Sequence, residues 1–349
     1  MKVVMTTRIG SLKDPDPAKK GIVEVCDMPL RKLNEGEILI KVAYCAICGS
    51  DPHSVEGIFG RPAPFGMGHE ISGVVAEVGP KADINGFKVG DRVSGNFRST
   101  CGTCYYCTNG MEQFCRHGGG EPGMAEYLIW HEKQAVKLPD DVSLKTGCIL
   151  EPVSIAVRAM DKSNIKFGQN VIVLGGGPIG LLTLQLANLY GAANLTISEP
   201  IAARRDIAVK YGAKHTIDPL SQDLKEEALK ITGGRGFDIL FEVSGVPKSA
   251  ETMQALAAPY ANLIYVAQYA RDYNMPVNMW DMLYMKEVTM TGIFVSPYTF
   301  SRTAQVIGRL DLDDMTSKVF DLDDAPAAFD AHMTGKYPKI LVKCNPDLE

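Results

Sequence analysis

The chain has 349 residues, of which 46% are hydrophobic and 22% are charged, and its formal net charge is −5. This length exceeds that of a usual single hydrophobic core and predicts two domains, while the composition is typical of a globular protein. The mild negative charge, with no block of like charges, argues against nucleic acid or an anionic membrane surface as the main partner.

The first part of the chain predicts short β-strands. Two apolar runs, over 22–25 and 38–42, are bounded by Pro, Asn and Gly. A third run, over 71–78, ends at Gly79, and a fourth begins at 90–93. Many short strands at close spacing indicate a β-rich, barrel-like domain.

After Glu151 the pattern changes to an alternation of helices and strands. The elements expected there are helix 154–160, strand 171–174, helix 178–190, strand 194–198, helix 202–211, a strand near 217, helix 222–231, strand 238–243, helix 248–257 and strand 262–266. This alternation predicts a parallel, doubly wound sheet, so the fold class is α/β. It ends near 290–294.

The last fifty residues predict helix 298–309, strand 319–320, helix 325–334 and strand 339–343. They fit better as the completion of the first domain than as a third domain. The expected boundaries are therefore 1–158 with 296–349 for the β-rich domain, and 159–295 for the doubly wound domain.

The apolar run 171–190 is about long enough to span a bilayer. It contains three consecutive glycines and two amide side chains, Gln185 and Asn188, and we interpret it as a buried strand, a glycine turn and a helix. No secretory signal is visible after Met1, and four of the nine cysteines are clustered between 101 and 115, which favours a metal site over disulfides. These features predict the cytosol as the compartment.

Four cysteines in fifteen residues form the most specific motif. Their spacing is Cys101-x2-Cys104-x2-Cys107-x7-Cys115, with Gly102 and Gly110 allowing tight turns. This pattern predicts a closed, tetrahedral structural zinc site in a lobe of about 95–118. An iron–sulfur cluster is the alternative, but its common motif has a shorter last gap and a following proline.

A second metal site is expected from residues far apart in the chain. Cys48, His69 and Glu151, with Glu70, supply a thiolate, an imidazole and carboxylates, which is the ligand set of a catalytic zinc with one open position. The alternative is a redox pair formed by Cys45 and Cys48, but that motif normally opens a helix, whereas here it ends a strand.

Three polar residues follow Cys48. Ser50 brings a hydroxyl close to the expected metal, and Asp51 is placed to accept the second ring N–H of a ligating histidine. His53 is near enough to continue a proton path.

A glycine-rich turn predicts the cofactor site. Gly175, Gly177, Pro178, Ile179 and Gly180 lie between an apolar strand and a helix, in the G-x-G-x-x-G pattern. The glycines let a pyrophosphate approach the backbone at the positive end of the helix.

The acid after the next strand indicates which dinucleotide is bound. Glu199 lies where a carboxylate binds both ribose hydroxyls and repels a 2′-phosphate, which favours NAD over NADP. Arg204 and Arg205 lie close by and leave NADP as the alternative.

Together these motifs make the chain resemble the zinc-containing medium-chain dehydrogenase/reductase family over residues 23–343. Gly68-His69-Glu70-x2-Gly73-x5-Gly79 is similar to the family's zinc signature, and Gly90-Asp91-Arg92-Val93 follows as expected. The resemblance implies a chaperonin-10-like (GroES-like) catalytic domain interrupted by a Rossmann domain. Glu151-Pro152-Val153, in place of a second cysteine, resembles the polyol (sorbitol-like) branch.

The resemblance also implies residue roles. Cys48, His69, Glu70 and Glu151 hold the catalytic zinc, one of the glutamates through water, with Asp51 orienting His69 and with Ser50 and His53 as the proton relay. The cofactor residues implied in addition are Val243, Ser244, Gly245, Val266 and Phe294 beside the nicotinamide half, and Lys339 at the pyrophosphate. Arg204, from its place close to Glu199, is a further candidate contact at the ribose end of the cofactor.

We therefore expect an NAD-dependent enzyme with two zinc ions per chain that oxidises a secondary alcohol of a polyol, cyclitol or sugar derivative to a ketone. A homotetramer or homodimer is expected, and no nucleic acid or membrane partner. The alternatives are a vicinal-diol or amino-alcohol dehydrogenase of the butanediol or threonine type, and a non-catalytic NAD-binding protein that kept the fold. Pro52, Arg158 and the glycine-rich segment 116–125 depart from the family pattern.

Overall fold

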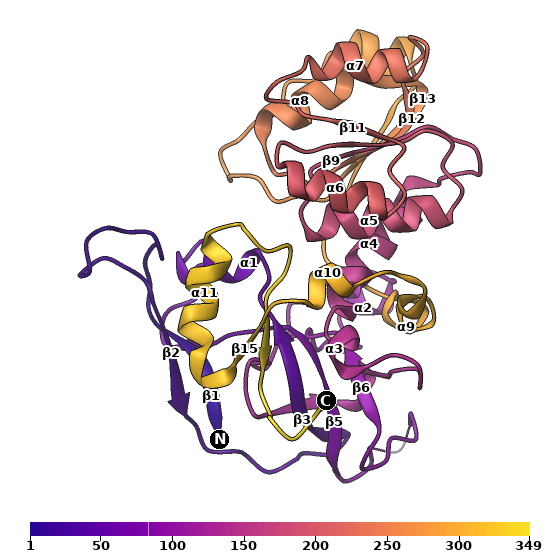
Figure 1. Cartoon of the computed structure of the whole chain (residues 1–349). Helices are drawn as coiled ribbons and strands as arrows, with labels where there is room; N and C mark the ends of the chain where they lie inside the picture. Colours follow the sequence, from indigo (N-terminus) through magenta and orange to yellow (C-terminus); the bar gives the residue numbers. More distant parts are fainter. Residues whose placement is uncertain (83) are drawn as a thin grey trace. The chain divides into compact units, whose positions relative to one another are not determined.

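The computed structural model describes residues 1–82 and 84–349 (Figure 1). The chain folds into two compact units: unit 1 comprises Met1–Glu151 and Phe300–Glu349, and unit 2 comprises Pro152–Thr299. The first boundary falls within helix α4 (Leu150–Ser163), a few residues before the position expected from the sequence. No helix in the described ranges has the length and apolar character needed to cross a membrane.

Unit 1 is built on a seven-stranded, mostly antiparallel sheet. Its strand order is β15-β16-β3-β5-β6-β8, with β7 also paired to β3. The strands are β3 (Glu37–Ala46), β5 (Glu70–Val78), β6 (Arg92–Gly95), β7 (Tyr127–His131), β8 (Ala135–Lys137), β15 (Val319–Asp321) and β16 (Leu341–Lys343). The tail thus adds two strands to the sheet begun by the N-terminal residues.

A second, three-stranded sheet of unit 1 has the order β2-β1-β4. It consists of β1 (Lys2–Arg8), β2 (Ile22–Asp27) and β4 (Phe65–Gly66). Alternating apolar residues of both sheets share one core, to which α11 contributes Ala328 and Phe329. Figure 1 shows α11 beside β2.

The helices of unit 1 are short. They are α1 (Ser50–Val55), α2 (Tyr105–Thr108), η1 (Glu112–Phe114), η2 (Glu132–Gln134), α3 (Leu144–Gly147), α9 (Phe300–Val306), η4 (Ile307–Arg309), α10 (Asp313–Thr316), η5 (Leu322–Asp324) and α11 (Ala325–Met333).

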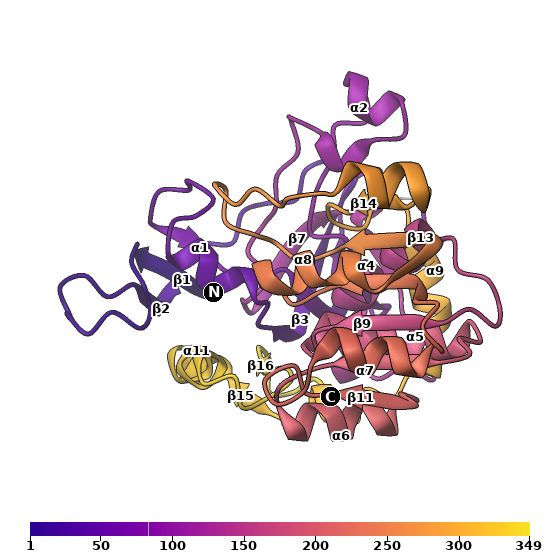
Figure 2. The same ribbon diagram turned by 90° about the horizontal axis from the view of Figure 1, so that it is seen from above.

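Unit 2 is a doubly wound domain around a six-stranded parallel sheet of order β11-β10-β9-β12-β13-β14 (Figure 2). The strands are β9 (Val171–Leu174), β10 (Leu195–Ser198), β11 (His215–Ile217), β12 (Phe237–Glu242), β13 (Ala257–Tyr265) and β14 (Thr289–Gly292). The order reverses between β9 and β12, and such a switch point is where this class of sheet forms its ligand crevice.

Helices cover both faces of that sheet. Figure 1 shows α5 and α6 on one face and α7 and α8 on the other. Their bounds are α5 (Pro178–Leu189), α6 (Ala202–Lys210), α7 (Leu224–Ile231) and α8 (Pro247–Ala255), and a π-helical turn, η3 (Trp280–Met285), precedes β14. The fold class expected from the sequence is confirmed.

Two elements start well before the position expected from the sequence. Helix α4 begins at Leu150 rather than at 154, because Pro152 lies in the first turn, where the missing N–H needs no partner. Strand β13 begins at Ala257, which was expected to end a helix, because Ala257 pairs with Phe237 of β12.

Candidate active site

The strand pairing of unit 1 brings three of the expected metal ligands together. Cys48 follows β3 and Glu70 begins β5, and the two strands are antiparallel with Ala46 opposite Glu70. One ligand atom each from Cys48, His69 and Glu70 lies within 4.8 Å of the others. Strand register therefore brings Cys48 to His69 and Glu70, which are neighbours in the sequence.

Asp51 holds two members of the cluster. Its Oδ2 accepts a hydrogen bond from the Cys48 backbone N–H at 2.8 Å, and its Oδ1 lies 3.4 Å from His69 Nδ1. Because Nδ1 faces Asp51, the other ring nitrogen of His69 is left for a metal. Helix α1 makes this possible, since its first turn points Asp51 back at Cys48; Pro52 fits there without loss of a hydrogen bond.

Lys339 lies beside Glu70. Its Nζ is 2.6 Å from both carboxylate oxygens, in hydrogen-bonding geometry with Oε1, and both side chains are buried. Oε2 has no hydrogen bond. Burial lowers the pKa of Lys339, but Glu70 and Cys48 outweigh that effect and raise it. The structure therefore places Lys339 at the metal cluster; its reach to a pyrophosphate stays a prediction.

Glu151 is buried at the start of α4 but does not belong to the tight group of three. Burial raises the pKa of its carboxyl to about 7, opposed by the charge of His69 and assisted by that of Glu70. Its role as a zinc ligand stays a prediction.

The cluster fits a zinc ion by its chemistry. It offers a thiolate, an imidazole and a carboxylate, and Oε2 of that carboxylate is buried with Lys339 Nζ at 2.6 Å but makes no hydrogen bond. Burial lowers the pKa of His69, yet Asp51 and Cys48 raise it well above its ordinary value. The side chains around His69 are therefore mainly acidic, and a bound cation would offset their negative charge.

The proposed relay residues lie on α1. Ser50 is its first residue and His53 lies in its last turn, and both are partly exposed. Their partial exposure suits groups that exchange a proton with solvent; a direct bond between them is not found.

The sequence reading missed Phe97. Its ring centroid is 5.0 Å from that of His69, at an interplanar angle of 52°. A Cβ on Gly120 would lie 3.2 Å from the Phe97 carbonyl oxygen, so the glycine-rich loop packs directly behind this residue. An aromatic residue just after β6 and shortly before Cys101 was the available signal.

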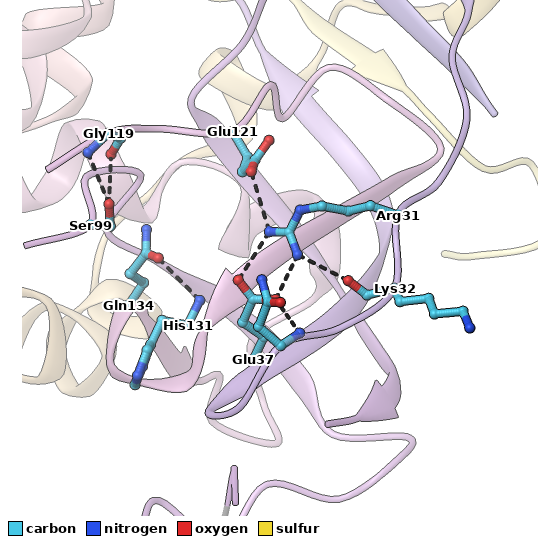
Figure 3. A network of polar contacts seen from close by, with 9 residues as sticks. Arg31, Lys32, Glu37, Ser99, Gly119, Glu121, His131 and Gln134 are labelled. Atoms are coloured by element: carbon cyan, nitrogen blue, oxygen red, sulfur yellow. Dashed lines mark hydrogen bonds and ion pairs between the residues drawn. The ribbon is translucent and has the colours of Figure 1, made fainter. Parts of the chain in front are cut away.

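The same glycine-rich loop is held at two further points, shown in Figure 3. Ser99 and Gly119 bond each other through backbone and hydroxyl groups at 2.8–3.2 Å. Arg31 forms an ion pair with Glu37 at 2.6 Å and another with Glu121 at 3.3 Å. The loop therefore has a fixed position against the segment that carries Phe97.

The four clustered cysteines converge as expected. Adjacent sulfur atoms are 3.6–4.0 Å apart, and all four lie within 4.8 Å of one another. A tetrahedron with Zn–S bonds of ~2.3 Å has sulfur–sulfur edges of about 3.8 Å. Hydrogen bonds from the backbone of Thr103 and Cys104 lower the pKa of Cys101 to about 5. The residues fit a structural zinc.

In unit 2 the glycine turn has the expected form. Gly175 has φ +113°, and a Cβ there would lie 3.0 Å from Ser244; a Cβ on Gly180 would lie 1.9 Å from the Gly175 carbonyl oxygen. Gly177 caps α5 and Pro178 and Ile179 are its first residues. Only glycine permits this packing, and it exposes backbone N–H groups at the helix start, where a pyrophosphate fits.

Glu199 binds the backbone of the glycine turn. It is buried, and its carboxylate accepts hydrogen bonds from the N–H of Gly176 at 2.6 Å and of Ile201 at 2.9 Å. Arg205 donates to the carbonyl oxygens of Glu199 and Pro200 and pairs with Asp218 at 3.5 Å. Arg205 is thus engaged by groups of the protein; Arg204, on α6, stays a predicted contact of the ribose.

The residues expected beside the nicotinamide half follow the carboxyl ends of adjacent strands. Val243, Ser244 and Gly245 follow β12, Val266 follows β13, and Phe294, half exposed, follows β14. Parallel strands place these ends at one edge of the sheet, as the expectation requires.

Comparison with known proteins agrees with both units. The family model of the alcohol dehydrogenase GroES-like domain matches residues 34–140, and that of the zinc-binding dehydrogenase matches 178–310.

Two curated relatives cover nearly the whole chain. A 2-dehydro-3-deoxy-L-galactonate 5-dehydrogenase of Pseudoalteromonas atlantica is 35% identical over 89% of this chain and 92% of its own. An L-threonine 3-dehydrogenase of Pyrococcus abyssi is 33% identical over 91% and 94%. A Sinorhizobium meliloti structure assigned as a zinc-binding dehydrogenase, bound to NADP, is 28% identical with a TM-score of 0.88, covering 98% and 99%.

Proposed function

Because the chain belongs to the zinc-containing medium-chain dehydrogenase/reductase family and is an alcohol dehydrogenase, we propose that it oxidises a secondary alcohol of a polyol, cyclitol or sugar derivative to a ketone, with NAD as the hydride acceptor. The convergence of Cys48, His69 and Glu70 carries the proposal. The relative named for a sugar-acid 5-dehydrogenase supports the substrate class.

The residues of unit 1 hold and tune the metal. Cys48, His69 and Glu70 would bind zinc directly, Glu151 would join them directly or through water, and Asp51 keeps His69 in the ligating tautomer. When bound, zinc supplies Lewis-acid catalysis that makes a hydroxyl more acidic.

The residues that remove the substrate proton lie on α1 in this proposal. The Ser50 hydroxyl would accept the substrate proton while releasing its own towards His53, which is partly exposed in the last turn of the same helix. A hydroxyl oxygen can relay a proton by accepting one and releasing another, and a histidine ring nitrogen can hold it.

NAD is preferred to NADP because of Glu199. Its buried carboxylate leaves little tolerance for a 2′-phosphate, and Arg205 is already bound to backbone carbonyls and Asp218. The similar structure from Sinorhizobium meliloti is bound to NADP, so NADP is the alternative cofactor. A ratio of Kd values for NADH and NADPH decides between them.

The second candidate is an amino-alcohol or vicinal-diol dehydrogenase. The threonine dehydrogenase relative, at 33% identity, favours it. Glu151, in place of a second cysteine, favours the polyol class instead.

The test is a panel of polyols, cyclitols, sugar acids, sugar phosphates, threonine and butanediol, followed by NADH absorbance. We expect the first four classes to contain the best substrate, and Cys48→Ser to lose at least about 100-fold in turnover with loss of the catalytic zinc. Cys26→Ser, a thiol on β2 distant in sequence from either cluster, serves as the control. Full turnover by Cys48→Ser would contradict the proposal, and threonine as best substrate would favour the second candidate.

We propose further that a second copy of the chain covers one face of unit 2. The turn η3 and the residue before it expose a group of apolar side chains a few residues ahead of the edge strand β14: Met279, Trp280, Leu283, Tyr284 and Met285. An unpaired edge strand beside such a patch favours self-association. Sedimentation should show a dimer or tetramer, and Trp280→Lys should shift it towards monomer; an unshifted variant would exclude this face.

The cytosol is the proposed compartment. All nine cysteines are free thiols, including those of both clusters. Metal-binding thiolates require reducing conditions, which the cytosol supplies.

A further inference from the structure

A buried carboxylate that the function above does not use lies at the switch point of unit 2. Glu242 is the last residue of β12 and is 0% exposed. It pairs with Leu174 of β9, the residue before Gly175, and with Tyr265 of β13. It therefore lies beside the crevice in which this class of sheet binds a dinucleotide.

All the hydrogen bonds that Glu242 accepts come from neutral donors. They come from the N–H and hydroxyl of Ser244, the N–H of Gly245 at 3.3 Å and the hydroxyl of Tyr269. Each of the two carboxylate oxygens accepts one of these backbone N–H groups, which can only donate. In the described part of the chain, no ion pair with Lys, Arg or His offsets its charge.

Two tyrosines lie close to Glu242 and respond to it. The Tyr265 hydroxyl is buried without a hydrogen bond, and burial together with Glu242 raises the pKa of both Tyr265 and Tyr269. Buried carboxylates are normally hydrogen-bonded or paired with cations, and a positively charged group of a ligand in this crevice would supply such a cation to Glu242. The backbone N–H groups that bind Glu242 belong to Ser244 and Gly245, which are expected beside the nicotinamide half.

We propose that Glu242 is an electrostatic positioning residue that favours binding of the oxidised, positively charged nicotinamide relative to the reduced, neutral one. This inference rests on the proposed NAD site. The two cofactor forms differ by one positive charge on the nicotinamide ring, so a buried negative charge at that end of the crevice discriminates between them. Loosening of the turn 243–245 alone would weaken both forms alike.

The test measures the ratio of Kd for NAD⁺ to Kd for NADH by calorimetry, without substrate. Glu242→Gln keeps the size and removes the charge, and we expect the ratio to rise by roughly threefold to thirtyfold. Tyr269→Phe is the matched control, because it removes one hydrogen bond to the same carboxylate and leaves the charge. Both Kd values should rise together in that variant, with the ratio unchanged.

An unchanged ratio in a Glu242→Gln protein that binds both forms would overturn this inference and leave the proposed function intact. A wild-type protein that binds neither form would overturn both. If Glu242→Gln does not fold, Tyr269→Lys tests the same charge by placing an ammonium beside the carboxylate: the ratio must rise, and an unchanged ratio overturns the inference.

Discussion

A lysine with 3% of its side chain exposed keeps its charge only beside an acid, and Lys339 has Glu70 for that purpose. The pair is buried within the cluster that also contains Cys48 and His69. Removing one member of a buried pair leaves the other charge uncompensated, which usually costs more than the pair itself contributes. If Lys339 mainly neutralises Glu70, removing it should lower the free energy of unfolding. If Lys339 contacts the pyrophosphate, removing it should weaken cofactor binding instead.

We expect Lys339→Met to lower the free energy of unfolding by about 3 kcal/mol, because Glu70 is left buried without its cation. Urea unfolding measures this loss, and the Glu70→Gln/Lys339→Met double variant should recover most of it. The Kd for NADH should change little if Lys339 serves Glu70 alone. A large rise in that Kd with unchanged stability would assign Lys339 to the pyrophosphate instead.

His332, on α11, gives a pH dependence with a defined sign. Burial lowers its pKa to about 4, helped by the charge of Lys339 and opposed by that of Asp51. Since the unfolded value is ~6.5, the unfolded chain binds more protons between these two pH values. The stabilisation is therefore complete above pH 6.5 and is lost as the pH falls towards 4.

We expect wild type to lose about 1–2 kcal/mol more than His332→Gln between pH 7 and pH 5, after discounting for partial exposure. Comparing the two proteins cancels the titration of every other group. Parallel stability profiles for the two proteins would show that His332 contributes nothing to the acid sensitivity.

At the scale of single residues, sequence spacing predicted the four-cysteine site because its ligands lie within fifteen residues. The contacts of Lys339 with Glu70 and of Phe97 with His69 depend instead on strand register and on ring packing. Lys339 meets Glu70 across 269 positions of the chain, and no local pattern records that distance. The ligands of a metal site can therefore be predicted from the sequence more readily than the residues that support those ligands.

The metal lobe is an element with almost no core of its own. Helix α2 and the turn η1 bury none of their residues, and Cys115 is the most buried of the four thiols. In small zinc peptides the metal supplies on the order of ~10 kcal/mol of folding free energy. The lobe should therefore depend on its metal.

We expect Cys104→Ser to reduce the zinc content from two ions per chain to one and to make the segment 101–115 sensitive to protease. Metal analysis and limited proteolysis measure both effects. Cys344→Ser is the matched control, because that buried thiol lies outside both clusters. Two retained zinc ions and an intact segment in Cys104→Ser would contradict a structural site here.

Helices and strands were predicted best where one face or a whole run is apolar. The β9 strand and α5 follow directly from their composition, whereas β13 starts earlier than expected because pairing with β12 overrides the helical pattern near Ala257. Helix α4 begins at Leu150, before the expected residue 154, because the first turn of a helix tolerates Pro152. Tertiary pairing and helix-end chemistry, rather than propensity, decide such positions.

At the scale of the whole molecule, unit 2 is one continuous segment and unit 1 is not. The tail supplies β15 and β16 to the seven-stranded sheet and places Phe329 and Ile340 in the core of unit 1. A continuous unit with its own core can fold alone, whereas a sheet without its paired strand exposes a backbone edge and a core face.

We therefore expect residues 152–299 to fold by themselves and to bind NADH, with a cooperative thermal transition and quenchable NADH fluorescence. Residues 1–151 alone should be insoluble or unfolded, because β3 loses β16 and Glu70 loses Lys339. Adding residues 300–349 through a short Gly/Ser linker in place of unit 2 should restore a cooperatively folded protein that binds zinc. A folded 1–151 fragment would show that the tail is dispensable, and an unfolded 152–299 fragment would show that unit 2 depends on the rest of the chain.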